Sequence, residues 1–280
     1  HCTCRRQRQM CIRDRALSTI WFGLSTAEFI LPVLITYFFL IYSWRTVWQG
    51  IAILIILFLP FVILNTIKSI KLDSREADPN PSYKKLKIKS WRRRDVLKDY
   101  RFYIVSLNML AMPWIATGVF VYQSFISDSK MWAIYTIPKA FMVYSITSIA
   151  TLFVSGFLVD KFTGRKLIMY MNIPLLFAMI TLFYFNNEIF AYVFLGLIGV
   201  SNGLANILGS STWAEIYGVK YIGSIKALTT AFMVFSTAFG TAVFGLLIDK
   251  GFTIENIAFL GATYVVISLA LLIIILSLIH

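Results

Sequence analysis

Long apolar segments dominate the sequence and limit the folds open to it. A helix that crosses a bilayer needs about 20 mostly apolar residues. Only 14% of the 280 residues are charged and the mean hydropathy is +0.76, whereas soluble domains contain about 25% charged residues. The sequence therefore predicts an all-α membrane protein with eight transmembrane helices, at residues 17–42, 46–67, 102–125, 133–159, 166–185, 189–210, 225–248 and 256–279.

Positive charge is concentrated in two segments outside the predicted spans. The net charge is +13. Residues 1–15 contain five Arg and one Asp, and residues 67–101 contain twelve Lys or Arg and five Asp or Glu. We interpret residues 68–101 as a solvated linker whose basic part, residues 84–94, also binds anionic lipid. Because the basic residues lie beside the membrane, no nucleic-acid partner is predicted.

Lysine and arginine counts also predict the orientation in the membrane, since cytoplasmic loops carry the excess. If the linker 68–101 is cytoplasmic, the loops at 161–166 and 220–226 lie on the same side. Fewer basic residues then lie on the other side: Arg45, Lys130, Lys139 and Lys250. With eight spans, both chain ends face the cytoplasm of a multi-pass protein of the cell (inner) membrane.

A short pattern recurs at the ends of two spans. Gly156-Phe-Leu-Val-Asp160-Lys161 ends the fourth predicted span, and Gly245-Leu-Leu-Ile-Asp249-Lys250 ends the seventh, 89 residues later. Three spans separate the two copies, so they lie on opposite sides of the membrane. This arrangement is typical of inverted repeats of three helices each.

The loop after the fourth span resembles a known signature. Asp160-Lys161-Phe162-Thr163-Gly164-Arg165-Lys166 is similar to the cytoplasmic signature of the major facilitator superfamily, with one extra residue before the glycine. Trp213-Ala-Glu-Ile-Tyr-Gly218 weakly resembles the monocarboxylate and oxalate/formate branch. The resemblance implies that the eight spans are family helices five to twelve, with helices one to four outside this sequence.

The same resemblance implies a division of the chain into four parts. We expect residues 1–15 to be a non-native leader and residues 16–67 to be the last two helices of the N-terminal half. Residues 68–101 are then the cytoplasmic linker. Residues 102–280 are a complete six-helix C-terminal bundle with 3+3 inverted repeats, so the chain as a whole is an incomplete copy of the family fold.

The resemblance also implies a function, namely secondary active transport of a small solute by alternating access. We expect a monomer without a cofactor, an organic anion as substrate and the proton as coupling ion. A non-transporting receptor or structural membrane protein, or an inactive fragment, remains the alternative. A membrane-embedded enzyme or a metal site is disfavoured, because no cluster of His, Asp or Glu is present and all three cysteines lie in the first eleven residues.

The signature loop supplies the expected conformational switch, formed by Asp160, Gly164, Arg165 and Lys166. A carboxylate at a helix end accepts hydrogen bonds from the N-terminus of a neighbouring helix, and the resemblance makes that neighbour the start of the first span. Glycine at position 164 permits a tight turn. An ordinary basic loop that follows the charge rule is the alternative.

Polar residues inside spans are the candidates for the transport site. Glu28 is the only acid well inside a span, and we weigh proton coupling or substrate binding against a simple interhelical hydrogen bond. Lys139 meets an anionic substrate or lies at the interface. The neutral candidates are Asn108, Gln123, Asn202 and Asn206. The last two are four residues apart and share a helical face, where they line a cavity or link two helices.

Small residues in the later spans predict close helix packing. Gly199 and Gly203 form a Gly-x-x-x-Gly step in the sixth span, and Gly240 and Gly245 lie in the seventh. Residues without a side chain let helix backbones approach closely in a membrane.

Overall fold

The computed structural model describes residues 23, 26–69, 91–218 and 221–279. Within these ranges the chain forms helices and turns and no strand. Seven helices are long and apolar enough to cross a membrane. An eighth apolar helix, Thr26–Ile41, is shorter, and only Gly23 is described among the residues that precede it in the predicted first span. The chain is therefore an all-α membrane protein, and the predicted count of eight spans is not established.

Contacts divide the chain into two units, with residues 33–88 forming the smaller one. The part of the helix Thr26–Ile41 from residue 33 onward belongs to this unit. The helix α2 (Trp44–Ser69) follows it after a tight turn. The amide of Val47 donates to the carbonyl of Ser43 at 3.2 Å. The guanidinium of Arg45 lies 5.2 Å from the centre of the Trp44 ring. Such aromatic and basic residues are common at membrane interfaces.

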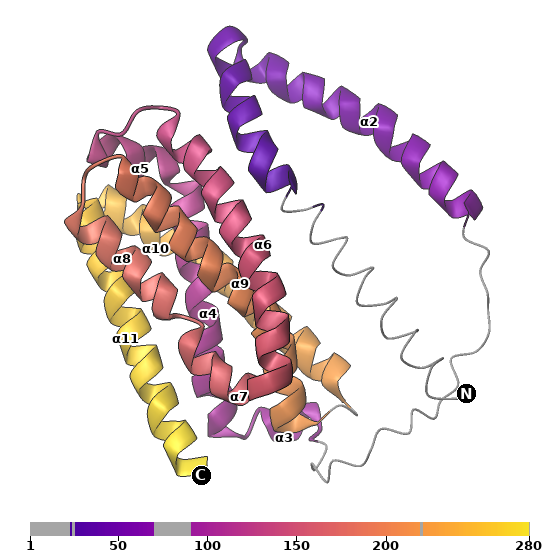
Figure 1. Cartoon of the computed structure of the whole chain (residues 1–280), viewed down its shortest axis with the longest axis vertical. Coiled ribbons are helices and arrows are strands. Elements are labelled where there is room, and N and C mark those ends of the chain that lie inside the picture. Colours follow the sequence, from indigo (N-terminus) through magenta and orange to yellow (C-terminus); the bar gives the residue numbers. More distant parts are fainter. Residues whose placement is uncertain (1–22, 24–25, 70–90, 219–220, 280) are drawn as a thin grey trace. The chain divides into compact units, whose positions relative to one another are not determined.

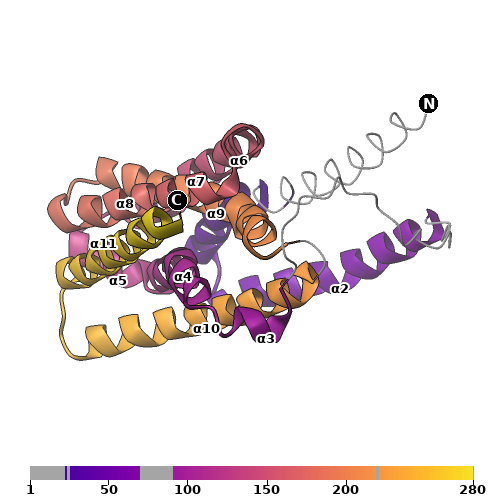
Figure 2. The ribbon, with the colours of Figure 1, turned by 90° about the horizontal axis from the view of Figure 1, so that it is seen from below.

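The larger unit contains a bundle of six spans (Figures 1 and 2). A short helix α3 precedes it, a short helix α5 follows its first span, and its third span is divided into three pieces. The elements are α3 (Arg93–Val96), α4 (Tyr100–Val121), α5 (Gln123–Lys130), α6 (Thr136–Phe162), α7 (Gly164–Leu167), η1 (Ile168–Tyr170), α8 (Ile173–Tyr184), α9 (Ile189–Tyr217), α10 (Ile222–Asp249) and α11 (Ile254–Ile279).

Two spans differ from the sequence prediction. The predicted span 166–185 is interrupted at Asn172, and a new helix begins at Ile173 with Pro174 in its first turn. Proline is favoured there because it lacks the N–H that the first turn leaves unpaired. The predicted span 189–210 continues to Tyr217 as α9. Its last turns bury Trp213 and Tyr217 almost completely, so tertiary packing prolongs the helix beyond the Gly-Ser-Ser segment.

Helix contacts in the bundle have the symmetry of two equivalent units. α6 packs on α9 and α4 on α10, while α8 packs on both α9 and α11, and α11 packs on α4. Exchanging α4, α6 and α8 for α9, α10 and α11 leaves this set of contacts unchanged. Such exchange symmetry is expected of an inverted repeat.

The equivalence extends to individual residues. A Cβ atom built on Gly240 of α10 would meet the backbone of Trp114 in α4. With the 89-residue offset, Thr151 of α6 corresponds to Gly240, and Gly203 of α9 corresponds to Trp114. A Cβ on Gly203 would lie 2.8 Å from the Cβ of Thr151. In both pairs the glycine is the position of closest approach, which is the packing role expected for Gly203 and Gly240.

Side chains from three neighbouring elements bind consecutive turns of α4. Tyr264 donates its hydroxyl to the carbonyl of Leu107 at 2.9 Å, and Ser236 donates to the carbonyl of Leu110 at 3.0 Å. Between them, the amide nitrogen of Asn172 donates to the carbonyl of Asn108 at 2.6 Å. These bonds lie just before Pro113. Proline has no N–H, so Pro113 cannot donate to the carbonyl of Met109 as another helical residue would.

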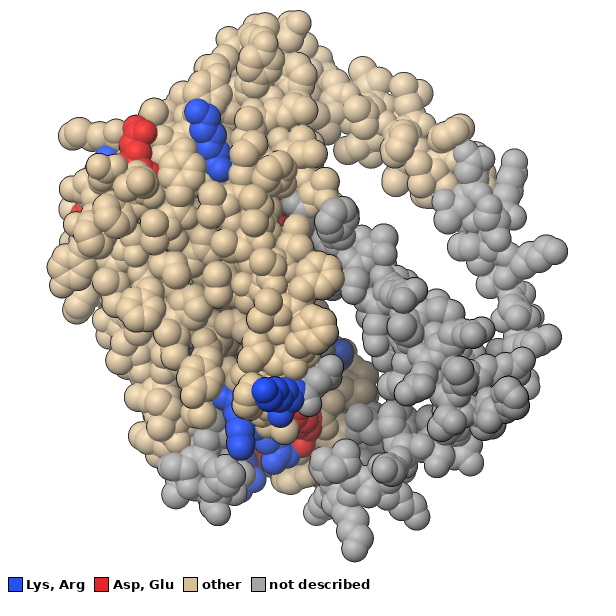
Figure 3. Space-filling view, in the orientation of Figure 1, with Lys and Arg blue, Asp and Glu red and all other residues tan. Residues whose placement is uncertain are grey.

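Charged side chains gather at the two ends of the bundle, with a broad uncharged band between them (Figure 3). We call the end that carries residues 161–166 the motif end, and the end that carries α5 and the turn between α8 and α9 the opposite end. An uncharged band of this kind suits the hydrocarbon core of a bilayer.

Candidate functional site

A cavity of about 500 Å³ lies among α4, α6, α9 and α10. On α9 and α10 the lining residues belong to the middle and the motif-end part of the helix, whereas on α4 they extend from Ser106 to Phe120. Four methionines contribute to its wall: Met109, Met112, Met171 and Met233. Methionine is flexible and polarizable, so a wall of this kind adapts to apolar groups of different shape.

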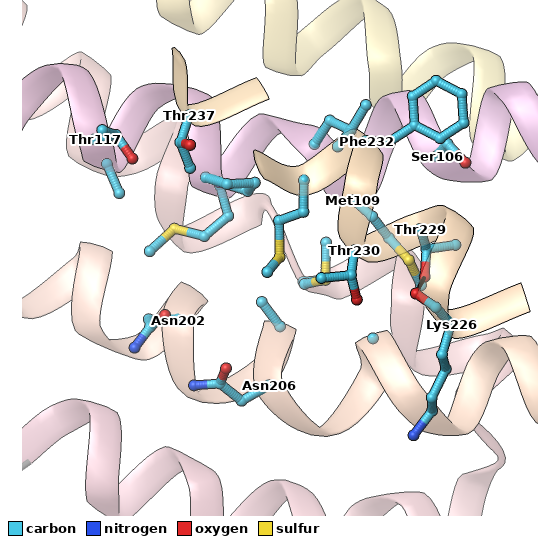
Figure 4. Close-up of a pocket in the computed structure, with 18 of the residues that line it drawn as sticks. Ser106, Met109, Thr117, Asn202, Asn206, Lys226, Thr229, Thr230, Phe232 and Thr237 are labelled. Atoms are coloured by element: carbon cyan, nitrogen blue, oxygen red, sulfur yellow. Dashed lines mark hydrogen bonds between the residues drawn. The ribbon is translucent and has the colours of Figure 1, made fainter. Parts of the chain in front are cut away.

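The polar part of the cavity is formed mainly by α9 and the start of α10 (Figure 4). Asn202 and Asn206 project from successive turns of α9, and Lys226 extends from α10 beside Thr229 and Thr230. Among the described residues that line the cavity, Lys226 alone has a charged side chain, and this side chain is exposed. The cavity thus combines an apolar wall with one cation and several neutral hydrogen-bonding groups, which is typical of small-molecule sites.

The predicted site residues lie in different places. Asn202 lines the cavity and also donates from its amide nitrogen to the hydroxyl of Ser148 at 3.0 Å, so it both lines the cavity and links α9 to α6. Gln123 and Lys139 are exposed near the opposite end, with the Lys139 amine 5.9 Å from the Tyr135 ring centre. Neither of them lines the cavity.

Asn108 and Glu28 are placed differently again. Asn108 is fully buried, and both polar atoms of its side chain have no hydrogen-bond partner within the described part of the chain. It lies between two cavity-lining turns of α4 without lining the cavity itself. Glu28 is half-buried near the start of the helix Thr26–Ile41 and is not a lining residue.

The signature loop is bound by an acid on α9. The Glu215 carboxylate accepts hydrogen bonds from the backbone N–H of Gly164, at 2.8 Å, and of Arg165, at 3.1 Å. The Arg165 guanidinium in turn donates to the Glu215 carbonyl oxygen. Glu215 therefore closes the N-terminus of α7 and fastens the loop to α9, a favourable use of a carboxylate at a helix N-terminus.

The tight turn expected at Gly164 is made one residue earlier, at Thr163, and Gly164 has a different role. Thr163 carries the positive φ of +66°, a conformation that is rare and costly for a β-branched residue. A Cβ on Gly164 would lie 3.0 Å from the Ser211 hydroxyl and 3.2 Å from the Glu215 carboxylate. Glycine at position 164 therefore serves close approach to α9 rather than an unusual backbone angle.

The other loop predictions are partly outside the described residues. Lys166 is exposed at the motif end. The side chain of Asp160 and its expected partner at the start of the first span lie outside what the structure describes. Glu215 was not among the predicted site residues, although the sequence pattern around Trp213 and Gly218 pointed to the right segment.

An aromatic cluster closes the motif end of the bundle. The ring centres of Phe102 and Trp213 are 5.2 Å apart, and those of Trp213 and Tyr217 are 5.9 Å apart. The end of the linker packs on this cluster: the amide of Trp91 donates to the carbonyl of Tyr217 at 3.1 Å. The Tyr217 hydroxyl donates to Asp99, the N-cap residue of α4, at 3.2 Å. The predicted linker thus ends in a structured segment from Trp91 onward.

Groups of three or more His, Cys, Asp or Glu side chains that are placed to hold a metal ion do not occur among the described residues. The cavity and the loop contact suggest binding and conformational change. Secondary transporters need these two properties, a polar site at the junction of helices and two alternative packings.

Comparison with protein families finds one match. The family model described as Major Facilitator Superfamily matches residues 12–241, which include both helices before the linker and most of the six-span bundle. The match does not distinguish the monocarboxylate branch from others. The comparison with curated proteins finds no match.

Proposed function

The chain belongs to the Major Facilitator Superfamily, and from this premise we propose that it carries a small organic anion across the membrane by alternating access. It is a multi-pass membrane protein of a family of transporters. The observation that carries the proposal is the cavity beside α4, α9 and α10, where Lys226 is the only charged side chain among the described lining residues. Lys226 is exposed at the motif-end side of this cavity, where its charge attracts anions toward the lining hydroxyl and amide groups.

The apolar wall supports a substrate with both an anionic and an apolar part. The carboxylate of such a solute pairs with Lys226 and accepts hydrogen bonds from Thr229 or Thr230, while its apolar part contacts the methionine wall. The neutral amides of Asn202 and Asn206 bind a hydroxyl or carbonyl group of the solute. A volume of about 500 Å³ is in the usual range for small-molecule pockets.

Replacing Lys226 by glutamine is expected to reduce uptake of carboxylates about tenfold or more, because a charged hydrogen bond contributes about 1.5–3 kcal/mol. Initial uptake rates into proteoliposomes, measured over a panel of mono- and dicarboxylates, provide the check. Lys226→Arg keeps the charge and is expected to keep part of the activity. Lys139→Gln removes an exposed lysine away from the cavity and is the matched control. Equal uptake by Lys226→Gln and wild type would refute an anion site at Lys226.

Proton coupling is proposed through Glu28. A carboxyl group inside a membrane span is costly unless it has a functional or structural partner, and Glu28 is half-buried near the start of its helix. In this scheme Glu28 takes up a proton on one side of the membrane and releases it on the other. A coupled proton gradient then drives uptake of the anion.

Glu28→Gln is expected to remove the dependence of uptake on external pH, because glutamine has no proton to exchange. Uptake is measured from pH 5 to pH 8 with and without an imposed proton gradient. Exchange of labelled for unlabelled substrate at equal pH is expected to persist in the variant. A pH profile identical to that of the wild-type protein would assign Glu28 a structural role instead. Asp128→Asn, at an exposed site of α5, is the control.

The orientation proposed for the chain places the motif end in the cytoplasm. Support comes from the excess of lysine and arginine at this end of the bundle, where Lys161, Arg165 and Lys166 lie. At the start of α3, the exposed N-cap residue Arg92 and the exposed helix residues Arg93 and Arg94 suit contact with anionic lipid headgroups. The remaining lysines proposed for lipid binding, from 84 to 89, lie outside the described residues.

We propose that the signature loop acts as the conformational switch on this side. Asp160, Gly164, Arg165 and Lys166 form one short segment, and Glu215 binds two of its backbone amides. Release of such a contact in one conformation and its formation in the other gives the two packings that alternating access needs. The protein is proposed to act as a monomer. A receptor that binds the anion without moving it is the remaining alternative, and uptake measurements decide between the two.

A further inference from the structure

The opposite end of the bundle holds a buried lysine with two partners. The Lys130 amine lies 2.7 Å from the Glu255 carboxylate and 2.7 Å from the Asn186 side-chain oxygen. The Lys130 side chain is 0% exposed, whereas that of Glu255 is 38% exposed. Two further bonds close the group, since Trp132 donates to the Asn186 carbonyl at 2.6 Å and the Ala133 amide donates to Glu188 at 2.9 Å. We call Lys130, Asn186, Glu188 and Glu255 the opposite-end clasp.

The clasp joins three separate elements. Lys130 ends α5, which follows α4. Asn186 and Glu188 lie in the turn between α8 and α9, and Glu255 is in the first turn of α11. A buried ammonium group needs a compensating charge and hydrogen-bond acceptors, and it becomes strongly unfavourable when they are removed. The contact is therefore able to hold these three elements in one arrangement.

The clasp corresponds, through the repeat, to the contacts at the motif end. Asp99 directly precedes α4 and accepts a hydrogen bond from Tyr217 at the end of α9. Glu188, 89 residues later, directly precedes α9 and accepts one from Ala133, which follows α5. An acid at the start of the first helix of each unit thus contacts the other unit, at the end of its first helix (Tyr217) in one case and just after α5 (Ala133) in the other.

The contacts made by the third spans correspond in the same way. At the motif end, the connection between the second and third spans of one unit is fastened to Glu215, near the end of α9. At the opposite end, Glu255 begins the third span of the other unit and is fastened to Lys130, after the end of α4. Glu255 is 89 residues after Lys166. Because the repeat is inverted, these two fastenings lie on opposite faces of the membrane.

The position of the cavity indicates what the clasp does. The lining residues of α9 and α10 lie in the middle and motif-end parts of these helices, and those of α4 extend as far as Phe120. The exposed lining residues Lys226, Thr230 and Met233 all lie in the motif-end half of α10. Nearer the opposite end the same bundle is closed by tightly packed apolar side chains, among them Ile137, Ala140, Phe194, Leu195, Ile257 and Ala258. In this arrangement the clasp is closed. The exposed part of the cavity lining lies toward the motif end.

We propose that the opposite-end clasp is a second conformational latch, which keeps the opposite ends of α4, α9 and α11 together while the cavity is open toward the motif end. The latch releases when the cavity opens toward the opposite side. This inference rests on the proposed alternating access. It assigns Lys130 and Glu255 the role of positioning residues, since they lie away from the cavity and act through the helices that form it.

The test measures from which side the cavity is accessible, and it requires no transport substrate. The cavity-lining Thr237 is replaced by cysteine in a protein whose three native cysteines are changed to serine. A membrane-impermeant maleimide is then applied to vesicles of known orientation, from either side. Lys130→Gln and Glu255→Gln are expected to raise labelling from the opposite side about fivefold or more relative to labelling from the motif side, a typical size for conformational coupling.

Three variants separate a latch from a purely structural salt bridge. The charge-exchanged pair, Lys130→Glu with Glu255→Lys, restores the attraction and is expected to return the labelling ratio toward that of the wild type. Lys139→Gln, an exposed lysine at the same end, leaves the ratio unchanged. If Lys130→Gln fails to fold, Glu255→Gln carries the test, because the Glu255 side chain is 38% exposed: a raised ratio supports the latch and an unchanged ratio overturns it.

The failures of the two proposals are distinguishable. A folded Lys130→Gln protein with an unchanged labelling ratio overturns the latch, whether or not the protein takes up anions. A shifted ratio with no uptake of any carboxylate supports the latch and removes the proposed substrate class.

Discussion

Replacing Glu215 by alanine is expected to reduce uptake more than any other single change outside the cavity, by about a hundredfold. The carboxylate accepts the backbone amides of Gly164 and Arg165, and no other acceptor for these groups occurs among the described residues. A donor left unpaired in a buried site costs about 1–3 kcal/mol, and two such donors are affected. The cost falls on the loop that we propose as the switch, so the expected result is a loss of turnover rather than of substrate affinity.

The measurement compares the maximal uptake rate with the substrate concentration at half-maximal uptake. Glu215→Gln keeps one acceptor oxygen and is expected to retain an intermediate rate. Asp128→Asn removes an exposed acid from α5 and serves as the matched control. If Glu215→Ala were folded and transported at the wild-type rate, the contact between the loop and α9 would be dispensable and the switch would have to lie elsewhere.

Replacing Gly203 by alanine is expected to have the largest effect on folding. A Cβ at this position would lie 2.6 Å from the Ser148 carbonyl oxygen and 3.0 Å from the Leu152 amide nitrogen. Both are backbone atoms of α6, so no side-chain rotation relieves the overlap and the two helices have to separate. Overpacking of a core costs about 1–3 kcal/mol, and here it disrupts one of the principal helix contacts of the bundle.

Thermal unfolding in detergent and the yield of monodisperse protein report this effect. Gly223→Ala is the matched control, since a Cβ there meets no atom within 4 Å. Gly199→Ala is expected to behave like Gly203→Ala, because its Cβ would meet the Tyr144 backbone. An unfolding temperature for Gly203→Ala within a degree of the control would show that α6 and α9 tolerate a wider separation than their packing suggests.

The sequence predicts the spans well because length and hydropathy are local properties of the chain. It fails where tertiary contacts decide. The break at Asn172 depends on a hydrogen bond to the α4 backbone as well as on Pro174. The extension of α9 to Tyr217 depends on the burial of its aromatic side chains against Phe102.

For the candidate site too, the sequence predicts what depends on local spacing but not what depends on tertiary contacts. From their helical spacing, Asn202 and Asn206 were expected either to line a cavity or to link two helices; both line the cavity, and Asn202 also bonds Ser148 of α6. Lys226 and Glu215 were not predicted as site residues, because each lies near a helix end where charged residues are common. Only the packing of α9 against α7 and α10 shows that one of them meets the signature loop and the other faces the cavity. Lys139, by contrast, is as basic as Lys226 but lies outside the cavity.

The hydrogen bonds to α4 have a mechanical consequence. Pro113 removes one rung from the ladder of backbone bonds in this helix, which makes the turn before it the easiest place to bend. Yet the carbonyls of that turn are bound by Asn172, Ser236 and Tyr264, which belong to three different parts of the bundle. A bend at this point cannot stay local, because it pulls on α8, α10 and α11 together. The weakest turn of α4 is thereby the joint through which a small displacement beside the cavity spreads to half of the bundle.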